Sequence, residues 1–169
     1  LALALQPHVQ RVHADISDGT ETAALCYRRG FEGGSLSQRL LALRDEEQRT
    51  RQTAEGPHRD DVGLTLNELE ATAFASEGQQ RSLALSLKIG QALVLEQSSG
   101  QPPLMMLDDI FGELDPSRRR ALIRLLPPGT QKLVTTTGLD WLREEGMAGQ
   151  IYAVEQAKLI PETGALESF

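Results

Sequence analysis

The stretch Leu104-Met-Met-Leu-Asp-Asp109 decides the fold class of this 169-residue chain. Four apolar residues in a row are typical of a strand that is buried on both faces of a parallel sheet. Two carboxylates follow at the carboxyl end of the strand, the edge at which open α/β sheets bind ligands. The stretch predicts an α/β fold with a ligand site beside Asp108 and Asp109, and a loop that simply begins with two acids stays the alternative.

Downstream of this strand the chain continues to alternate between helices and strands. Asp115 is a good N-cap, Pro116 suits the first helical position, and Pro127-Pro-Gly129 ends the helix. We expect three further elements, namely strands over 132–137 and 151–154 and a short helix over 139–145. The order strand, helix, strand, helix, strand predicts right-handed crossovers and one parallel sheet.

Upstream, the stretch Ser76-Glu-Gly-Gln-Gln-Arg81 opens a long helix that we expect to end near Gln97. Ser76 and Gln79 have the spacing of an S-x-x-Q capping box. Gly78 leaves the backbone N–H groups of the first turn accessible, and the N-terminus of a helix is a natural phosphate site. Helix capping and phosphate binding both stay open for these residues.

The part before residue 56 predicts a helix end up to about Val12, a strand over 22–27 and a helix over 35–51. Gly56-Pro57 marks a turn before His58-Arg-Asp-Asp61, for which a structural ion pair, an interface or nucleotide-edge role and a metal site all stay open. We therefore divide the chain into residues 1–55, the end of a small helix-and-strand arm, and residues 56–169, an α/β lobe.

The composition is that of a globular protein, with 40% hydrophobic and 24% charged residues. No apolar run is long enough for a membrane span, and the single cysteine suits a reducing cytoplasm. The formal net charge of −7 argues against a DNA-binding surface on this chain by itself. The chain begins without methionine, so we expect it to be part of a longer protein.

The order of these motifs resembles a known group of ATPases. Ser76–Arg81, a helix, four apolar residues, Asp108-Asp109 and then Gly112-Glu-Leu-Asp115 are similar to the signature, Walker B and D-loop segments of ABC-type ATPases of the SMC, Rad50 and RecF group. Gly56-Pro-His-Arg-Asp-Asp61 and Thr135-Thr-Thr137 resemble the RecF family in particular. The resemblance covers roughly residues 20 to 157. It implies the C-terminal part of an ABC-type ATPase head, a parallel sheet flanked by helices.

The resemblance also implies roles for the signature residues. Ser76 and Gly78 are expected to contact the γ-phosphate of an ATP molecule that the partner subunit holds. Gln79 and Arg81 are expected to support that contact.

For the Walker B lobe, the resemblance implies that Asp108 holds Mg²⁺ and that Asp109 is the general base or positions the attacking water. Asp115 is expected to lie across a dimer interface near the partner's site. Thr136 is expected at the switch position, with Thr137 as the alternative.

Two features depart from the complete family pattern. Gly112 stands where the family usually has serine or alanine. No G-x-x-x-x-G-K-[ST] loop occurs, so the phosphate cradle and its lysine are expected in an N-terminal lobe that carries Walker A. The chain by itself is therefore expected to be inactive.

The resemblance implies a cytoplasmic, nucleoid-associated protein of DNA replication, gap repair and the SOS response. ATP is expected to join two heads into a homodimer that binds duplex DNA next to single-strand gaps. RecR and RecO are the implied partners, and RecA loading is the implied outcome. Half of another SMC-like or Rad50-like head, or a non-catalytic binding module, are the alternatives.

Overall fold

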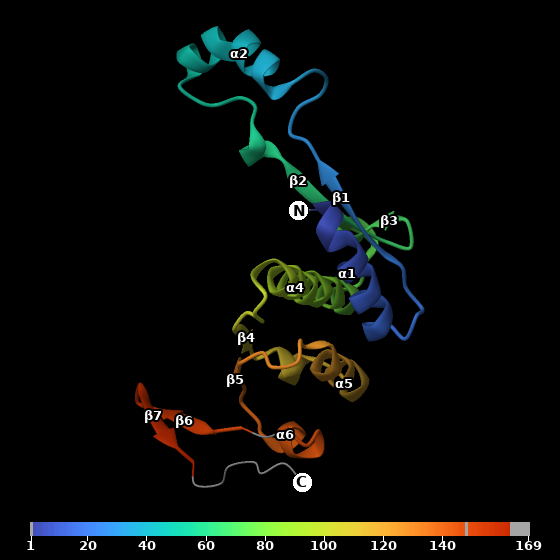
Figure 1. The fold of residues 1–169 in the computed structure, drawn as a ribbon, viewed down its shortest axis with the longest axis vertical. Coiled ribbons are helices and arrows are strands. Elements are labelled where there is room, and N and C mark those ends of the chain that lie inside the picture. Colours follow the sequence, from blue (N-terminus) through green and yellow to red (C-terminus); the bar gives the residue numbers. More distant parts are fainter. Residues whose placement is uncertain (1, 148, 163–169) are drawn as a thin grey trace. The chain divides into compact units, whose positions relative to one another are not determined.

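The computed structural model describes residues 2–147 and 149–162 (Figure 1). The chain folds into two compact units. The first unit comprises Leu1–Pro103 with Leu125–Gly129, and the second comprises Leu104–Arg124 with Thr130–Phe169. The signature residues fall in the first unit and the two adjacent aspartates in the second, so each unit is described by itself. The division at residue 55/56 remains a prediction.

The first unit combines four helices with a small antiparallel sheet. Its elements are α1 (Ala2–Ile16), β1 (Ala23–Arg28), α2 (Leu36–Thr50), a 3-10 turn (Pro57–Arg59), β2 (Asp61–Leu66), β3 (Leu69–Glu70), α3 (Ala71–Phe74) and α4 (Glu77–Ser99). The sheet order is β1-β2-β3, with Ala23 opposite Leu66. Asn67 and Glu68 both have a positive φ, which suits the tight two-residue turn between β2 and β3.

Helices α1 and α4 lie side by side and build the core of the first unit (Figure 1). The buried residues of this core come from both helices, from the sheet and from α3: Leu5, Val9, Ala23, Leu66, Ala71 and Leu83. Gly90 of α4 allows the close approach, because a Cβ atom there would lie 3.1 Å from Cγ2 of Val9. Helix α4 therefore packs closely against α1.

Helix α2 confirms the helix predicted over 35–51. Ser35 is the N-cap and forms a capping box with Gln38, while Arg51 ends the helix in the left-handed conformation. Helix α2 contains no buried residue. Arg39 pairs with Glu55 in the segment that follows. This part of the chain is thus stabilised by local polar contacts.

The second unit contains the predicted parallel strand pair. Its elements are β4 (Met105–Asp108), a 3-10 turn (Ile110–Glu113), α5 (Pro116–Leu125), β5 (Lys132–Thr135), α6 (Asp140–Glu144), β6 (Tyr152–Glu155) and β7 (Lys158–Pro161). Strands β4 and β5 pair in parallel, with Leu107 opposite Val134. The helix α5 between them is the crossover that such a pair requires. The α/β fold class is confirmed.

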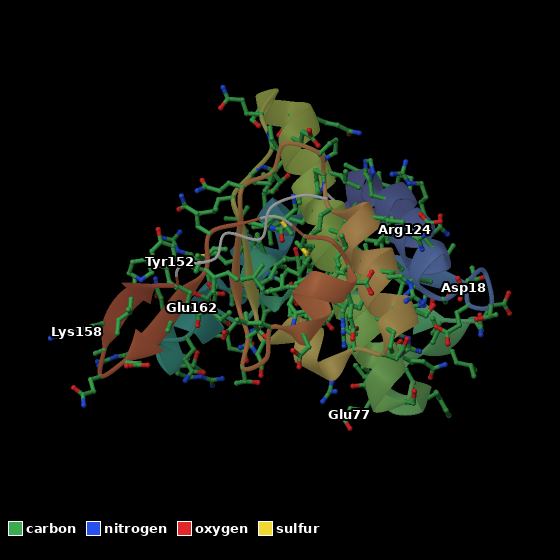
Figure 2. The ribbon with its side chains drawn as sticks, turned by 90° about the horizontal axis from the view of Figure 1, so that it is seen from below. Asp18, Glu77, Arg124, Tyr152, Lys158 and Glu162 are labelled. Atoms are coloured by element: carbon green, nitrogen blue, oxygen red, sulfur yellow. The ribbon has the colours of Figure 1, made fainter. Side chains whose placement is uncertain are left out.

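Two details of the predicted sheet are wrong. Strand β6 does not join β4 and β5 but pairs antiparallel with β7, because Gln156 and Ala157 adopt positive φ values of 47° and 62° and turn the chain back at once. Figure 2 shows Lys158 at the tip of this hairpin. Burial of β4 on both faces is also wrong, since Leu107 is 5% exposed but Met106 is 71% exposed.

Within the described residues, helix α4 is the longest helix, and neither it nor any other helix is long and apolar enough to cross a membrane.

Candidate nucleotide-binding site

The signature segment begins helix α4 as a complete capping box. The side-chain oxygen of Ser76 accepts the backbone N–H of Gln79 at 3.3 Å, and Oε1 of Gln79 accepts the backbone N–H of Ser76 at 2.8 Å. The predicted helix cap is therefore confirmed. Each side chain accepts a hydrogen bond from the backbone N–H of the other residue.

Capping does not exclude phosphate binding at this helix end. Ser76 is exposed and uses a lone pair for the cap, which leaves its hydroxyl hydrogen for another partner. The N–H groups of Glu77 and Gly78 belong to the first turn, where a helix has no carbonyl partner for them. The helix dipole adds a partial positive charge at the same end.

Two charged side chains flank this turn. Glu77 is 82% exposed and points outward at the end of α4 (Figure 2), where its carboxylate accepts a hydrogen bond of 2.8 Å from Arg81. Arg81 lies on the surface in this i,i+4 pair, about one turn after Glu77.

Gln79 is also connected to residues far away in the sequence. Its Nε2 donates to Oε1 of Glu21 at 2.8 Å, and Oε2 of Glu21 lies 2.9 Å from Nε2 of His13. His13 is fully buried, and its Nδ1 lies 3.3 Å from Oγ of Ser86. The sequence gives no signal for these contacts, because 58 positions separate Glu21 from Gln79.

In the second unit, Asp108 and Asp109 lie where the predicted strand ends. Asp108 is the last residue of β4, and its Oδ1 accepts the hydroxyl hydrogen of Thr135 on β5. The Thr135 hydroxyl also accepts the backbone N–H of Asp109 at 3.1 Å. Both carboxylates are exposed, so a ligand has access to them.

The backbone of Asp109 is left-handed, with φ 49° and ψ 16°. This conformation is uncommon for residues other than glycine, although Asp tolerates it better than most. Gly112 fits under the carboxylate, because a Cβ atom at Gly112 would lie 3.2 Å from Oδ1 of Asp109. The glycine that departs from the family pattern therefore leaves room for the Asp109 side chain.

Asp115 caps the helix that follows. Its Oδ1 accepts the backbone N–H of Arg118 at 3.0 Å, as the sequence predicts for an N-cap. The neighbouring Arg119 lies over the ring of Trp141, 5.6 Å from the ring centroid, and donates to the carbonyl of Leu114 at 3.2 Å.

Thr136 is linked to the same aromatic group. Its hydroxyl donates to the carbonyl oxygen of Gly138 at 3.0 Å and accepts the indole N–H of Trp141 at 3.3 Å. Trp141 stacks on Phe111 with the ring centroids 4.3 Å apart. The contact with Asp108 thus comes from Thr135, a residue to which sequence reasoning gave no role.

The segment His58-Arg-Asp-Asp61 has a structural role in the first unit. Asp60 accepts the backbone N–H of Gly30 at 2.8 Å and the hydroxyl hydrogen of Tyr27. These two hydrogen bonds hold the pKa of Asp60 below its ordinary value, and the bond to Asp60 raises the pKa of Tyr27. Through these contacts Asp60 ties the segment 58–61 to the end of β1.

The carboxylates at the end of β4 suit Mg²⁺ better than a metal ion that is coordinated by protein side chains alone. No group of three or more His, Cys, Asp or Glu side chains gathers among the residues that the structure describes. Magnesium typically uses one or two carboxylates and fills its remaining positions with water and phosphate oxygens. Asp108, oriented by Thr135, fits that pattern.

The fold is similar to that of parts of RecF and of an SMC head. The solved structure of the recombination mediator protein RecF–ATP matches with a TM-score of 0.73 and 22% identity, over 95% of this chain and 44% of that one. The SMC head bound to the C-winged helix domain of ScpA matches with a TM-score of 0.58 and 15% identity, over 98% of this chain and 44% of that one. No family model matches the sequence.

Several sequence relatives are RecF proteins. The DNA replication and repair protein RecF of Crocosphaera subtropica is 36% identical over 92% of the chain, and that of Lactococcus lactis subsp. cremoris is 36% identical over 82%. The chain spans 43% and 38% of the lengths of these relatives, less than half of each. The chain corresponds to the C-terminal part of a RecF protein.

Proposed function

We propose that this chain is the signature and Walker B part of a RecF-like DNA-repair ATPase. The observation that carries the proposal is the pair of accessible carboxylates at the carboxyl end of β4, in a chain whose relatives are RecF proteins. The resemblance to the structures of RecF with ATP and with ATPrS supports ATP as the ligand.

In this proposal the second unit contributes to the nucleotide site of its own subunit. Asp108 would hold Mg²⁺, which neutralises phosphate charge when it is bound. Asp109 would orient the attacking water and accept its proton. Thr136 would sense the γ-phosphate at the switch, and Asp115 would lie near the site of the second subunit.

The signature turn would bind the γ-phosphate of ATP held by a second copy. Ser76 and Gly78 would donate hydrogen bonds to it, while Gln79 and Arg81 support the turn. Affinity between two heads would then depend on the nucleotide, because only ATP presents that phosphate. A Walker A loop in an N-terminal lobe would complete each site, and the chain by itself would not hydrolyse ATP.

At the level of the whole protein, we propose an ATP-dependent clamp on duplex DNA next to single-strand gaps. RecR and RecO would act with it and RecA loading would follow, in the cytoplasm during the SOS response. The net charge of −7 on this chain implies that the DNA contacts lie mainly in other parts of the full-length protein.

Ser76→Arg in the full-length protein tests the proposal. The large side chain would block a γ-phosphate at the turn but would not touch the nucleotide bound within the same subunit. We expect ATP binding within about twofold of wild type and loss of ATP-dependent dimers, because a hydrogen-bonded anion contact is replaced by a steric block. Calorimetry and light scattering measure the two quantities.

Ser98→Arg is the matched control, since Ser98 is an exposed serine near the other end of the same helix. It adds the same side chain and should leave dimers intact. Dimers that persist in Ser76→Arg would mean that the segment is a helix cap and no more.

A further inference from the structure

Glu21 connects the signature turn to the interior of the first unit. One carboxylate oxygen accepts from Nε2 of Gln79 at 2.8 Å, and the other lies 2.9 Å from Nε2 of His13. Glu21 comes from the loop between α1 and β1, whereas Gln79 lies in the first turn of α4. The side chain of Glu21 is 15% exposed and that of His13 is fully buried, so these contacts are well shielded from water.

The carboxylate determines which way the Gln79 amide faces. Oε1 of Gln79 must point toward the backbone N–H of Ser76 to complete the capping box. An amide flip would turn Oε1 toward Glu21 and the NH2 group toward the Ser76 N–H. Because an ionised carboxylate only accepts hydrogen bonds, this flipped state would lose both contacts.

His13 in turn fixes the position of Glu21. Its Nε2 donates to the carboxylate, and its Nδ1 lies 3.3 Å from Oγ of Ser86. Ser86 donates to the carbonyl of Ser82 at 2.7 Å.

A further contact reaches the signature segment, because the hydroxyl of Ser82 donates to the carbonyl of Gly78 at 3.0 Å. The side chains of Ser86 and Ser82 therefore lie between His13 and the first turn of α4. Buried polar side chains that all have hydrogen-bond partners hold one another in place.

We propose that Glu21 and His13 are positioning residues of the signature turn. They hold the Gln79 amide in the orientation that keeps Ser76 capped and its hydroxyl and the first-turn N–H groups aimed at an anion. The anion is the γ-phosphate, so this part of the inference rests on the proposed function. Neither residue needs to touch the nucleotide.

Glu21→Gln in the full-length protein is the direct test. The substitution preserves size but removes the charge and replaces one acceptor oxygen by an NH2 group, which can accept neither from Nε2 of Gln79 nor from a protonated Nε2 of His13. We expect ATP binding by a single subunit to stay within about twofold and ATP-dependent dimer affinity to fall about tenfold. Amide hydrogen exchange at residues 76–80 should become faster, while exchange in β1 and β2 stays unchanged.

Asp18→Asn is the matched control. Asp18 lies in the same loop, is exposed, points outward (Figure 2) and has a φ of 50°, a conformation that Asn also tolerates. Asp18→Asn also removes one carboxylate charge, three positions before Glu21. It should change neither dimer affinity nor amide hydrogen exchange at residues 76–80.

Two variants at His13 separate positioning from general stability. His13→Gln keeps an N–H donor near the place of Nε2 and should retain dimer affinity within about threefold, whereas His13→Leu should behave like Glu21→Gln. If His13→Leu does not fold, Glu21→Gln and His13→Gln still decide the matter.

The outcomes distinguish this inference from the proposed function. Wild-type dimer affinity and exchange in Glu21→Gln, with dimers lost in Ser76→Arg, would overturn the positioning role and leave the function standing. If the wild-type protein formed no ATP-dependent dimers, the function would fail. Local exchange at residues 76–80 would then decide on the positioning role by itself.

Discussion

The two regions that carry the proposed site are held in place by different means. The signature turn depends on side chains from distant parts of the sequence, since Gln79 is fixed by Glu21 and His13. The aspartates at the end of β4 depend on the neighbouring strand and on the backbone, through Thr135 and the left-handed Asp109. Single side-chain changes should therefore disturb the geometry of the first region more easily than that of the second.

Asp109→Asn gives the largest expected effect and tests the second region. Asparagine tolerates the left-handed backbone and keeps the shape of the side chain, so the geometry should persist. It cannot accept a proton, and ATP hydrolysis by the full-length protein should fall about 10²- to 10⁴-fold, the usual contribution of a general base. Phosphate release under saturating ATP measures the rate.

ATP-dependent dimers should persist in Asp109→Asn and last longer, because hydrolysis no longer separates them. Asp140→Asn, at an exposed position of the same unit, is the control for the lost charge. Hydrolysis at the wild-type rate in Asp109→Asn would remove this residue from catalysis, and a general loss of dimers would show that backbone geometry does not protect the second region.

The same contrast explains what the sequence could predict. Helix α4, its capping box and the placement of Asp108-Asp109 were predicted, because each depends on residues within one turn or one strand. Thr135, Glu21 and His13 were missed, because their contacts span 27, 58 and 73 positions and leave no local pattern. A sequence pattern reports on local geometry, whereas these hydrogen bonds exist only after the chain has folded.

The β6–β7 hairpin was missed for a different reason. Two-residue turns are recognised by glycine or asparagine, which accept positive φ most easily. Here Gln156 and Ala157 occupy the turn, so the sequence carries no turn signal and β6 was assigned to the parallel sheet.

Thr135→Val gives an intermediate effect and sharpens the comparison inside the second region. Valine keeps the shape of threonine but loses the hydroxyl that donates to Asp108 and accepts from Asp109. A hydrogen bond to a charged group contributes about 1.5–3 kcal/mol, and less at an exposed site such as this. We expect the Mg²⁺ concentration for half-maximal hydrolysis to rise about three- to tenfold.

Thr136→Val is the comparison variant, since its hydroxyl contacts Gly138 and Trp141. Thr136→Val should lower the melting temperature. It should change the Mg²⁺ concentration for half-maximal hydrolysis less than Thr135→Val does. The reverse order would assign the contact with the metal-holding aspartate to Thr136.

Asp60→Asn gives the smallest expected effect and tests a carboxylate that supports the fold of the first unit, outside the signature turn. The pKa of Asp60 is lowered by hydrogen bonds from the Gly30 N–H and the Tyr27 hydroxyl. A lowered folded-state pKa stabilises the protein above the unfolded value of about 3.9, and this stabilisation is lost as the pH falls through the folded pKa.

Wild type should therefore lose stability below about pH 4 more steeply than Asp60→Asn, in denaturant titrations followed by circular dichroism. Asp61→Asn changes the adjacent carboxylate and is the control for the lost charge. Equal slopes in wild type and Asp60→Asn would show that the fold of the segment 58–61 does not depend on the charge of Asp60. Side-chain hydrogen bonds would then contribute less to the stability of the first unit than these contacts suggest.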